Sequence, residues 1–195
     1  QQRRGRYSME MDINSRAAAV CRRLAVEYVD TAPLLVYENP FQLLVAVVLS
    51  AQTTDAQVNR ATPELFARFP TPDALAQAAA EDVEPLVRST GFYRSKARNI
   101  VACASEIVER HNGAVPDTME KLTKLPGVGR KSAGVILAVV YGKPAIIVDT
   151  HFGRVARRLQ FSDQTDPVRV ERQIAERIDR PLWSDLSMLL NRHGR

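Results

Sequence analysis

The segment that most constrains the fold is LPGVGRK, residues 125–131, in a chain of 195 residues. Pro126 ends the helix before it, because its ring fixes φ and disfavours helical geometry at the preceding residue. Gly127 and Gly129 are expected to supply the positive φ that a sharp turn requires. Residues 131–141 then form an apolar run that is long enough for about three turns of helix. The segment therefore predicts a tight turn between two helices, of which the second begins near Gly129.

The start of that second helix is a predicted anion site. Free N–H groups and the positive end of the helix dipole favour a negative ligand, and a phosphodiester suits them. Arg130 and Lys131 add two cations at the same end, which is unfavourable unless an anion compensates them. A lysine in this position is also a candidate nucleophile. The alternative is an ordinary solvated lysine at a helix start.

The charge distribution points to a phosphate-bearing partner. The net charge is +5 and the pI is near 9.5. Residues 85–98 hold four cations and no acid, whereas residues 121–158 hold eight cations and a single acid, Asp149. The acids gather instead at 73–84 and 163–185. One basic face with acids elsewhere is the footprint of nucleic-acid binding, and the alternative is a generic basic surface.

The rest of the chain predicts helices joined by short Gly- and Pro-containing loops, and no strand pairing is needed. An all-α fold is therefore expected. Residues 15–29 are expected to form a helix capped by Ser15, with a core stripe of Val20, Leu24, Val26 and Val29. Residues 41–51 predict a central buried helix. Further helix starts are expected at Asp55, Thr71, Ala80, Ser95, Thr118, Pro167 and Leu182.

Two further features bear on location and binding. Cys21 and Cys103 stand far apart in apolar helical contexts, which predicts core thiols in a reducing compartment and no disulfide or metal site. The longest uncharged apolar run, 41–51, is too short to cross a bilayer, and no signal peptide is evident after the Arg-rich start. An intracellular, cytoplasmic and nucleoid-associated protein without a membrane partner is expected. Phe92, between basic residues, is a candidate wedge into a base stack, or else it packs inward.

The segments LPGVGRKSA and VDTHFGRVARR resemble the helix–hairpin–helix and Gly/Pro/Asp loop of the endonuclease III family of DNA glycosylases. The resemblance extends from about residue 16 to the last residue. It implies a bifunctional DNA glycosylase and abasic-site lyase of base excision repair, which removes oxidised or ring-saturated pyrimidines from duplex DNA. In that family the lysine matching Lys131 attacks C1′ and forms a Schiff base, β-elimination cuts the strand, and the aspartate matching Asp149 is essential. Asp149 is also a natural N-cap for the helix that follows it, and the two roles are compatible.

The resemblance also assigns DNA-binding residues. Gln52 occupies a family loop that fills the gap left by an extruded nucleotide, and Phe92 matches the family's apolar wedge. The backbone of the hairpin is expected to hold phosphates, with basic residues nearby. His151 is expected to be structural or a phosphate contact. The complete DNA-binding set is Gln52, Phe92, Gly127, Val128, Gly129, Arg130, His151 and Arg154.

The family's architecture implies two helical lobes that flank a DNA-binding cleft. Residues 33–143 would form a six-helix barrel that contains the hairpin, and residues 9–32 with 144–195 would form the second lobe. Residues 1–8 would be a mobile tail. Lys131 and Asp149 would face each other across the cleft of a monomer. The family usually carries a [4Fe–4S] cluster on four cysteines that would lie beyond Arg195, and no metal ligands are expected within this sequence.

Two other functions are consistent with parts of the sequence. Adenine- or mismatch-type glycosylases without lyase activity share the motif, but the adenine branch carries a catalytic Glu where this chain has Ala46 and lacks the lysine. Helix–hairpin–helix motifs also occur in proteins that only hold DNA. The pair Lys131 and Asp149 at family spacing favours the bifunctional enzyme over both alternatives.

Overall fold

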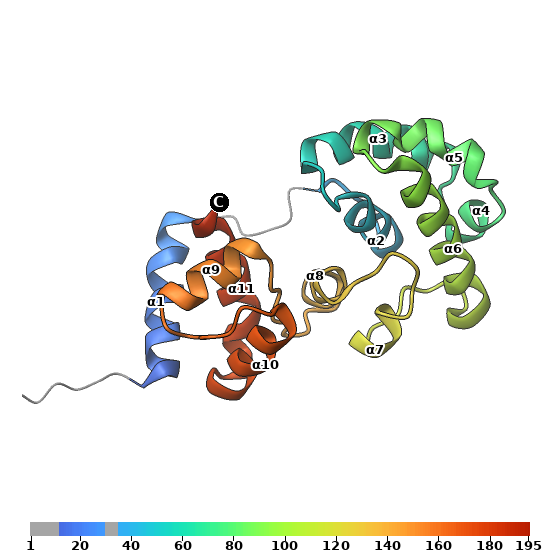
Figure 1. Ribbon diagram of the computed structural model, residues 1–195. Helices are drawn as coiled ribbons and strands as arrows, with labels where there is room; N and C mark the ends of the chain where they lie inside the picture. Colours follow the sequence, from blue (N-terminus) through green and yellow to red (C-terminus); the bar gives the residue numbers. More distant parts are fainter. Residues whose placement is uncertain (1–11, 30–34) are drawn as a thin grey trace, which may run out of the picture. The chain divides into compact units, whose positions relative to one another are not determined.

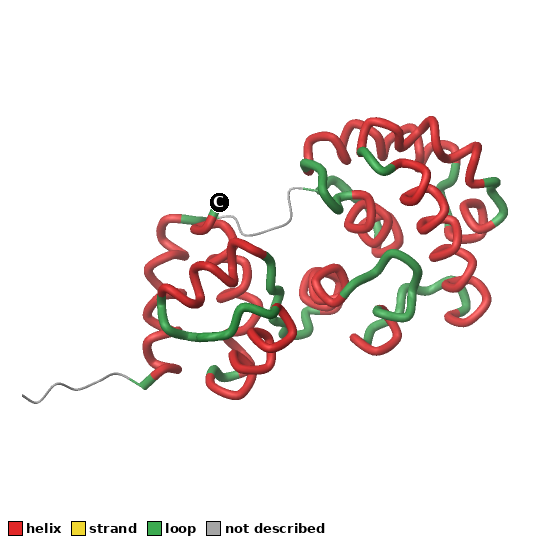
Figure 2. The backbone as a smooth tube through the Cα atoms, in the orientation of Figure 1, coloured by secondary structure: helices red, strands yellow, loops and turns green. Residues whose placement is uncertain are grey.

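A computed structural model describes residues 12–29 and 35–195, so the predicted tail 1–8 lies outside the described residues. Within these two ranges the chain forms α-helices and two short 3₁₀ helices, and it contains no strand (Figures 1 and 2). The all-α prediction is therefore confirmed. Among these helices none has both the length and the apolar character that crossing a membrane requires.

The chain divides into two compact units. One unit, called here the terminal unit, comprises Gln1–Thr31 and Ile146–Arg195, and the other, the central unit, comprises Ala32–Ala145. The central unit contains α2 (Pro40–Leu49), α3 (Asp55–Arg68), α4 (Pro72–Ala76), α5 (Ala80–Val87), η1 (Arg88–Thr90), α6 (Tyr93–His111), α7 (Met119–Leu122) and α8 (Arg130–Tyr141). The terminal unit contains α1 (Ile13–Glu27), α9 (Thr150–Arg158), α10 (Pro167–Arg177), η2 (Arg180–Leu182) and α11 (Trp183–Gly194).

Helix α2 forms the centre of the central unit, as the apolar run predicts. Residues 41–49 are all buried. The helix begins where Asn39 Oδ1 accepts a hydrogen bond from the Gln42 N–H at 3.0 Å, and Pro40 follows the cap. It packs against α3, α6 and α8, so a helix without a polar face is covered by its neighbours.

Several helix starts differ from the sequence prediction by one to three residues. Asp12, and not Ser15, caps α1 by accepting from the Asn14 and Ser15 N–H groups. Thr54, and not Asp55, caps α3. Thr71 caps α4 as predicted.

The predicted core stripe of α1 is partly wrong. Val26 and Val29 are 82% and 91% exposed, whereas the buried residues of the helix are Ala17 and Cys21. Val20 and Leu24 do pack against the core of the terminal unit.

The terminal unit has its own hydrophobic core, in which α11 packs against both α1 and α9. Phe152, Phe161 and Ile174 are fully buried there. The Ile147 N–H donates to Ser187 Oγ at 3.0 Å, which fixes the chain as it enters this unit.

Both cysteines are buried free thiols, as predicted. Cys21 belongs to the terminal unit and Cys103 to the central unit. Burial raises the pKa of Cys21 to about 11 and that of Cys103 to about 12. Neither side chain is therefore a reactive thiolate at neutral pH.

Candidate nucleic-acid interface and catalytic residues

The predicted hairpin joins α7 to α8. Gly127 adopts a φ of +78°, whereas Gly129 has a φ of −87°, so the left-handed conformation is needed at the first glycine only. Gly129 is instead the N-cap of α8, and its carbonyl accepts the first bond of the helix from the Ala133 N–H at 2.9 Å. The N–H groups at the start of α8 have no preceding helical carbonyl to bond, which is the geometry of an anion site.

Val128 faces away from this site. Its side chain is 5% exposed and belongs to the hydrophobic core, and its N–H donates to the Leu125 carbonyl at 3.1 Å. Of the hairpin residues predicted to contact DNA, Gly127, Gly129 and Arg130 are exposed at the surface. Val128 thus holds the turn in place from the inside.

The hairpin rests on two other helices of the central unit. A Cβ atom added at Gly127 would lie 3.0 Å from both Asn99 Cβ and Val48 Cγ1. Asn99 lies in the second turn of α6, and Val48 lies one residue before the end of α2. This close approach explains why the position suits glycine in addition to the turn's φ.

Gln52 and Phe92, the two residues predicted to fill the gap in the DNA, share an unusual conformation. Their φ angles are 55° and 48°, in the left-handed region that residues other than glycine seldom adopt. Both side chains are exposed, and Phe92 is 70% exposed and does not pack inward. Residues in such sparsely populated conformations are held by their surroundings and gather at functional sites.

A hydrogen bond joins the helix that follows the Gln52 loop to the 3₁₀ helix that precedes Phe92. Gln57, in the first turn of α3, donates from Nε2 to the Ser89 carbonyl in η1 at 3.1 Å. The Gln52 loop leaves the same end of α2 against which the hairpin rests, and the Phe92 loop leads into α6. The three predicted DNA-contact segments of the central unit therefore gather around the end of α2 and the start of α6.

Lys131 lies on the first turn of α8, and its side chain is exposed. The opposite face of the helix carries Ala133, Ile136 and Leu137 into the core. This apolar face fixes α8, and so it presents Lys131 and Arg130 to solvent beside the anion site.

Asp149 belongs to the terminal unit and caps α9 as the sequence suggests. Its Oδ1 accepts from the Phe152 N–H at 2.8 Å, and its Oδ2 accepts from Asn191 Nδ2. The residue is half-buried. Two donors thus fix the carboxylate, and each oxygen keeps a second acceptor position. No sequence signal identifies Asn191, which stands on α11 at a separation of 42 residues.

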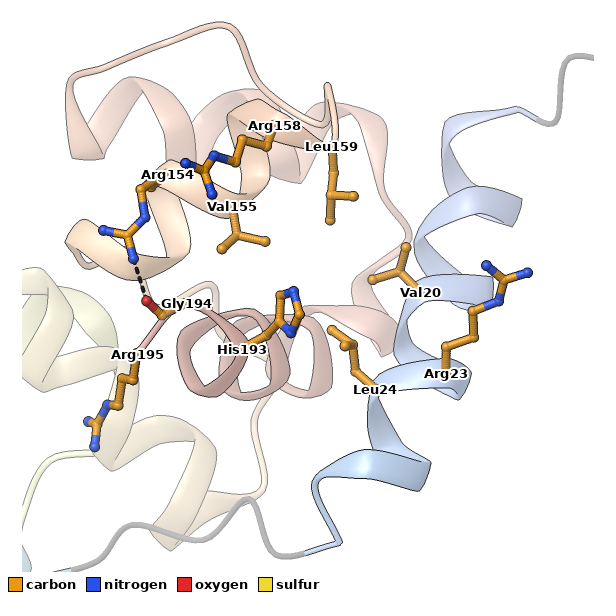
Figure 3. Close-up of a pocket in the computed structure, with 10 residues that line it drawn as sticks. All are labelled: Val20, Arg23, Leu24, Arg154, Val155, Arg158, Leu159, His193, Gly194 and Arg195. Atoms are coloured by element: carbon orange, nitrogen blue, oxygen red, sulfur yellow. Dashed lines mark hydrogen bonds between the residues drawn. The ribbon is translucent and has the colours of Figure 1, made fainter.

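His151 and Arg154 contact the end of α11 in this structure. His151 Nδ1 lies 2.8 Å from the Gly194 carbonyl oxygen. Arg154 donates to the same oxygen, as Figure 3 shows. Both contacts hold the end of α11, and the Arg154 guanidinium is favourable beside a helix C-terminus. Arg154 is nevertheless exposed, and its other guanidinium N–H groups can serve a phosphate. Arg154 also lines a pocket of ≈ 490 Å³ with Arg23, Arg158 and His193.

An iron–sulfur cluster of the kind that the family usually carries does not fit the residues of this sequence. Such a cluster needs four cysteine thiolates, and the sequence has two cysteines, both buried in hydrophobic cores. Within the described ranges no three His, Cys, Asp or Glu side chains gather as a metal site.

Comparison with known proteins gives consistent matches. Residues 45–180 match the family model described as HhH-GPD superfamily base excision DNA repair protein. Endonuclease III of Synechocystis is 48% identical over 160 residues, which cover 82% of this chain and 73% of that relative. Endonuclease III of Escherichia coli is 41% identical over 159 residues, which cover 82% of this chain and 75% of that relative.

A solved structure is similar over almost the whole chain. The structure of a trapped endonuclease III–DNA covalent intermediate superposes with a TM-score of 0.84 at 40% identity and covers 92% of this chain and 85% of that one. Sequence and structure thus agree on one family. The chain belongs to the HhH-GPD superfamily of base excision DNA repair proteins and, within it, to the endonuclease III family.

Proposed function

We propose that this chain is a bifunctional DNA glycosylase and abasic-site lyase of base excision repair. The observation that carries the proposal is the exposed Lys131 at the start of α8, directly after the hairpin. The chain is similar to a protein that was trapped as a covalent intermediate with DNA, and such an intermediate requires a nucleophile. Lys131 is the exposed amine at the predicted anion site.

The central unit binds duplex DNA. The N-terminal end of α8, the exposed backbone of Gly127 and Gly129, and the Arg130 guanidinium bind phosphates of the strand. The target nucleotide must leave the stack before C1′ can be attacked, and unstacking costs a few kcal/mol. Gln52 and Phe92 enter the gap and offset part of that cost.

The chemistry follows from an amine and a carboxylate. Lys131, as the free amine, attacks C1′, and the base departs with the electron pair of the glycosidic bond and takes up a proton. The sugar ring then opens to give a protonated imine. Loss of a proton from C2′ expels the 3′ phosphate, and hydrolysis of the imine releases the lysine. Positive charge develops on the sugar in the first step, and the Asp149 carboxylate stabilises it and helps to deprotonate Lys131.

This mechanism requires the two units to act as the two lobes of the family. We infer a barrel domain at 33–143 and a second lobe made of 9–32 with 144–195, preceded by a tail at 1–8. The proposed chemistry requires Lys131 and Asp149 to act on the same nucleotide. The substrates are oxidised or ring-saturated pyrimidines and abasic sites in duplex DNA, and the enzyme acts as a monomer at the nucleoid.

Borohydride trapping tests the proposed chemistry, because it reduces the imine to a stable covalent adduct. The parent is compared with Lys131→Ala and with the matched control Lys124→Ala. Lys124 is an exposed lysine before the hairpin that pairs with Glu120 at 2.8 Å. Each protein is mixed with duplexes that carry thymine glycol, an abasic site or no lesion.

The expected result is an adduct on both damaged duplexes for the parent and Lys124→Ala, and none for Lys131→Ala. An adduct on the abasic duplex alone would contradict the proposed lesion class and leave the lyase chemistry intact. An equal adduct from Lys131→Ala would overturn the assignment of the nucleophile. Tight, salt-sensitive binding without any adduct would favour a monofunctional enzyme or a DNA-binding protein.

A further inference from the structure

Lys96 is a buried lysine that the proposed mechanism does not use. It lies in the first turn of α6 and is 5% exposed. Its Nζ donates to the Thr90 carbonyl oxygen at 2.6 Å. No carboxylate of the described residues forms an ion pair with it. Burial lowers the pKa of Lys96, which means that the charged form loses hydration at this place.

An ammonium group in the core is costly for stability unless its surroundings compensate it. The hydrogen bond to Thr90 offers partial compensation, because a carbonyl oxygen carries a partial negative charge and accepts from the ammonium. An apolar side chain of the same length would fill this site without the cost of desolvating a charge. A lysine at this position is therefore better explained by its hydrogen bond to the Thr90 carbonyl, which constrains the backbone at Thr90, than by packing alone.

That geometry concerns the loop of Phe92. The Lys96 side chain binds Thr90 on one side of the loop, and the Lys96 backbone N–H donates to the Phe92 carbonyl at 3.0 Å on the other. Thr90 is itself buried, and its hydroxyl donates to the Val87 carbonyl at 2.8 Å. One residue thus ties both ends of the segment from Thr90 to Phe92.

The segment needs such support because its backbone is strained. Phe92 is held at φ 48° and ψ 30° with its ring in solvent, and Gly91 before it has a φ of 69°. A left-handed conformation at a residue with a bulky side chain persists only where neighbouring contacts over-determine it. Burial of the ring does not contribute that support, because the ring is exposed.

We propose that Lys96 is a positioning residue that holds Phe92 in its exposed left-handed conformation, ready to enter the base stack, through the bond from Nζ to the Thr90 carbonyl. The inference rests on the proposed function of Phe92 as the wedge. Loss of the ammonium leaves the Thr90 carbonyl without this donor, so the loop relaxes and Phe92 must be reordered each time the protein opens a duplex. Attack on a nucleotide that is not stacked does not need the wedge and is not affected.

The test compares Lys96→Met, Lys96→Arg, Phe92→Ala and the double variant Phe92→Ala/Lys96→Met with the parent. The control is Arg110→Met, which removes an exposed cation from the other end of the same helix, where it pairs with Glu106. Single-turnover borohydride trapping is measured on an abasic site in a duplex and on the same site in a single-stranded oligonucleotide. Thermal unfolding of each variant verifies that it is folded.

The expected loss for Lys96→Met on the duplex is on the order of tenfold, the effect of losing one base–aromatic stacking contact. On the single strand its rate stays within about twofold of the parent. The double variant is no slower than the slower single variant, because both changes remove the same contact. Lys96→Arg keeps a cationic donor and therefore retains more of the duplex rate than Lys96→Met. If Lys96→Met does not fold, the comparison is made between Lys96→Arg and the parent.

Three results would overturn the inference while the proposed function stands. The first is a loss of trapping rate in Lys96→Met that is equal on the duplex and on the single strand. The second is a loss of duplex rate in the double variant that equals the sum of the two single losses in free energy. The third is a duplex rate for Lys96→Met that equals that of Arg110→Met. A parent that gives no adduct on either substrate overturns the proposed function, and the inference falls with it. Normal trapping by the parent combined with a harmless Phe92→Ala overturns the role of the wedge and of Lys96 together.

Discussion

Gly127 is the residue on which the hairpin depends most. Two independent constraints meet there, a φ of +78° and a close approach to α6 and α2. Gly129 has neither, because its φ is −87° and a Cβ atom would meet nothing within 4 Å. The two glycines look equivalent in the sequence, and the structure gives them different roles.

Replacing each glycine with alanine separates these roles. Gly127→Ala forces a left-handed alanine against Asn99 and Val48, and it is expected to lower the free energy of unfolding by about 2 kcal/mol or more. Gly129→Ala alters an N-cap only and is expected to cost about 0.5–1 kcal/mol. Urea unfolding of both variants measures the difference. Equal costs would contradict the geometry described for the turn.

Asp149 combines a structural and a proposed chemical role, and these can be tested apart. Asn at this position still accepts from the Phe152 N–H but carries no charge, whereas Ala loses the cap as well. Asp149→Asn and Asp149→Ala are each expected to slow base release at least ~100-fold, as for other preorganised charges at an active site. Asp149→Ala alone should lose a further ~1 kcal/mol of stability. Single-turnover rates and urea midpoints provide the two readouts, and a fast Asp149→Asn enzyme would refute the electrostatic role.

At the level of elements, the sequence predicts helix identity well and helix ends less well. Residues 41–51 and 131–141 are long and apolar enough that packing leaves little choice. They coincide with helices α2 (Pro40–Leu49) and α8 (Arg130–Tyr141), although α2 ends two residues before the apolar run does. The N-cap is harder to predict, because neighbouring residues can all cap a helix and the backbone geometry decides between them. This is the case for Asp12 and Ser15 at α1, and for Thr54 and Asp55 at α3.

The predicted face of α1 was wrong for a geometrical reason. Val26 lies two residues after Leu24, which at 3.6 residues per turn places it on the opposite side of the helix. A count of apolar residues without their angular positions therefore overestimates the core face, and Ala17 and Cys21 are the residues that are buried.

Contacts between distant segments could not be predicted at all. Asn191 beside Asp149 and Asn99 beside Gly127 each depend on tertiary packing. The sequence names residues that match a motif, but it does not show which neighbours orient them.

Helix α2 is buried on every side and should not tolerate a charged side chain. Ala46 lies within this helix and is 0% exposed, so a carboxylate introduced at this position would be cut off from solvent. Ala46→Glu places that carboxylate in the core of the central unit and is expected to lower the free energy of unfolding by about 3 kcal/mol or more. The control Ala56→Glu adds an acid to the exposed first turn of α3 and should change stability by less than about 0.5 kcal/mol. Equal effects in thermal unfolding would contradict the packing described for α2.

Each of the two units contains one buried cysteine, whose reaction with a thiol reagent can report the unfolding of that unit. A thiol with a pKa of about 11, such as Cys21, is a thiolate in on the order of one molecule in a thousand at pH 8. Cys103, with a pKa of about 12, is still less reactive. Both are expected to resist iodoacetamide in the native protein and to react once their own unit unfolds. Peptide mass spectrometry across a urea series then shows whether the two units open together, and rapid labelling without urea would contradict the burial of either thiol.

Lys131 is the proposed nucleophile, and the identity of the residue that becomes bonded to DNA tests this assignment. An abasic duplex is trapped with borohydride, the adduct is digested with protease and nuclease, and the modified peptide is sequenced by mass spectrometry. The sugar remnant is expected on Lys131. A remnant on another lysine, or on an N-terminal amine, would contradict the assignment of this helix start as the catalytic centre.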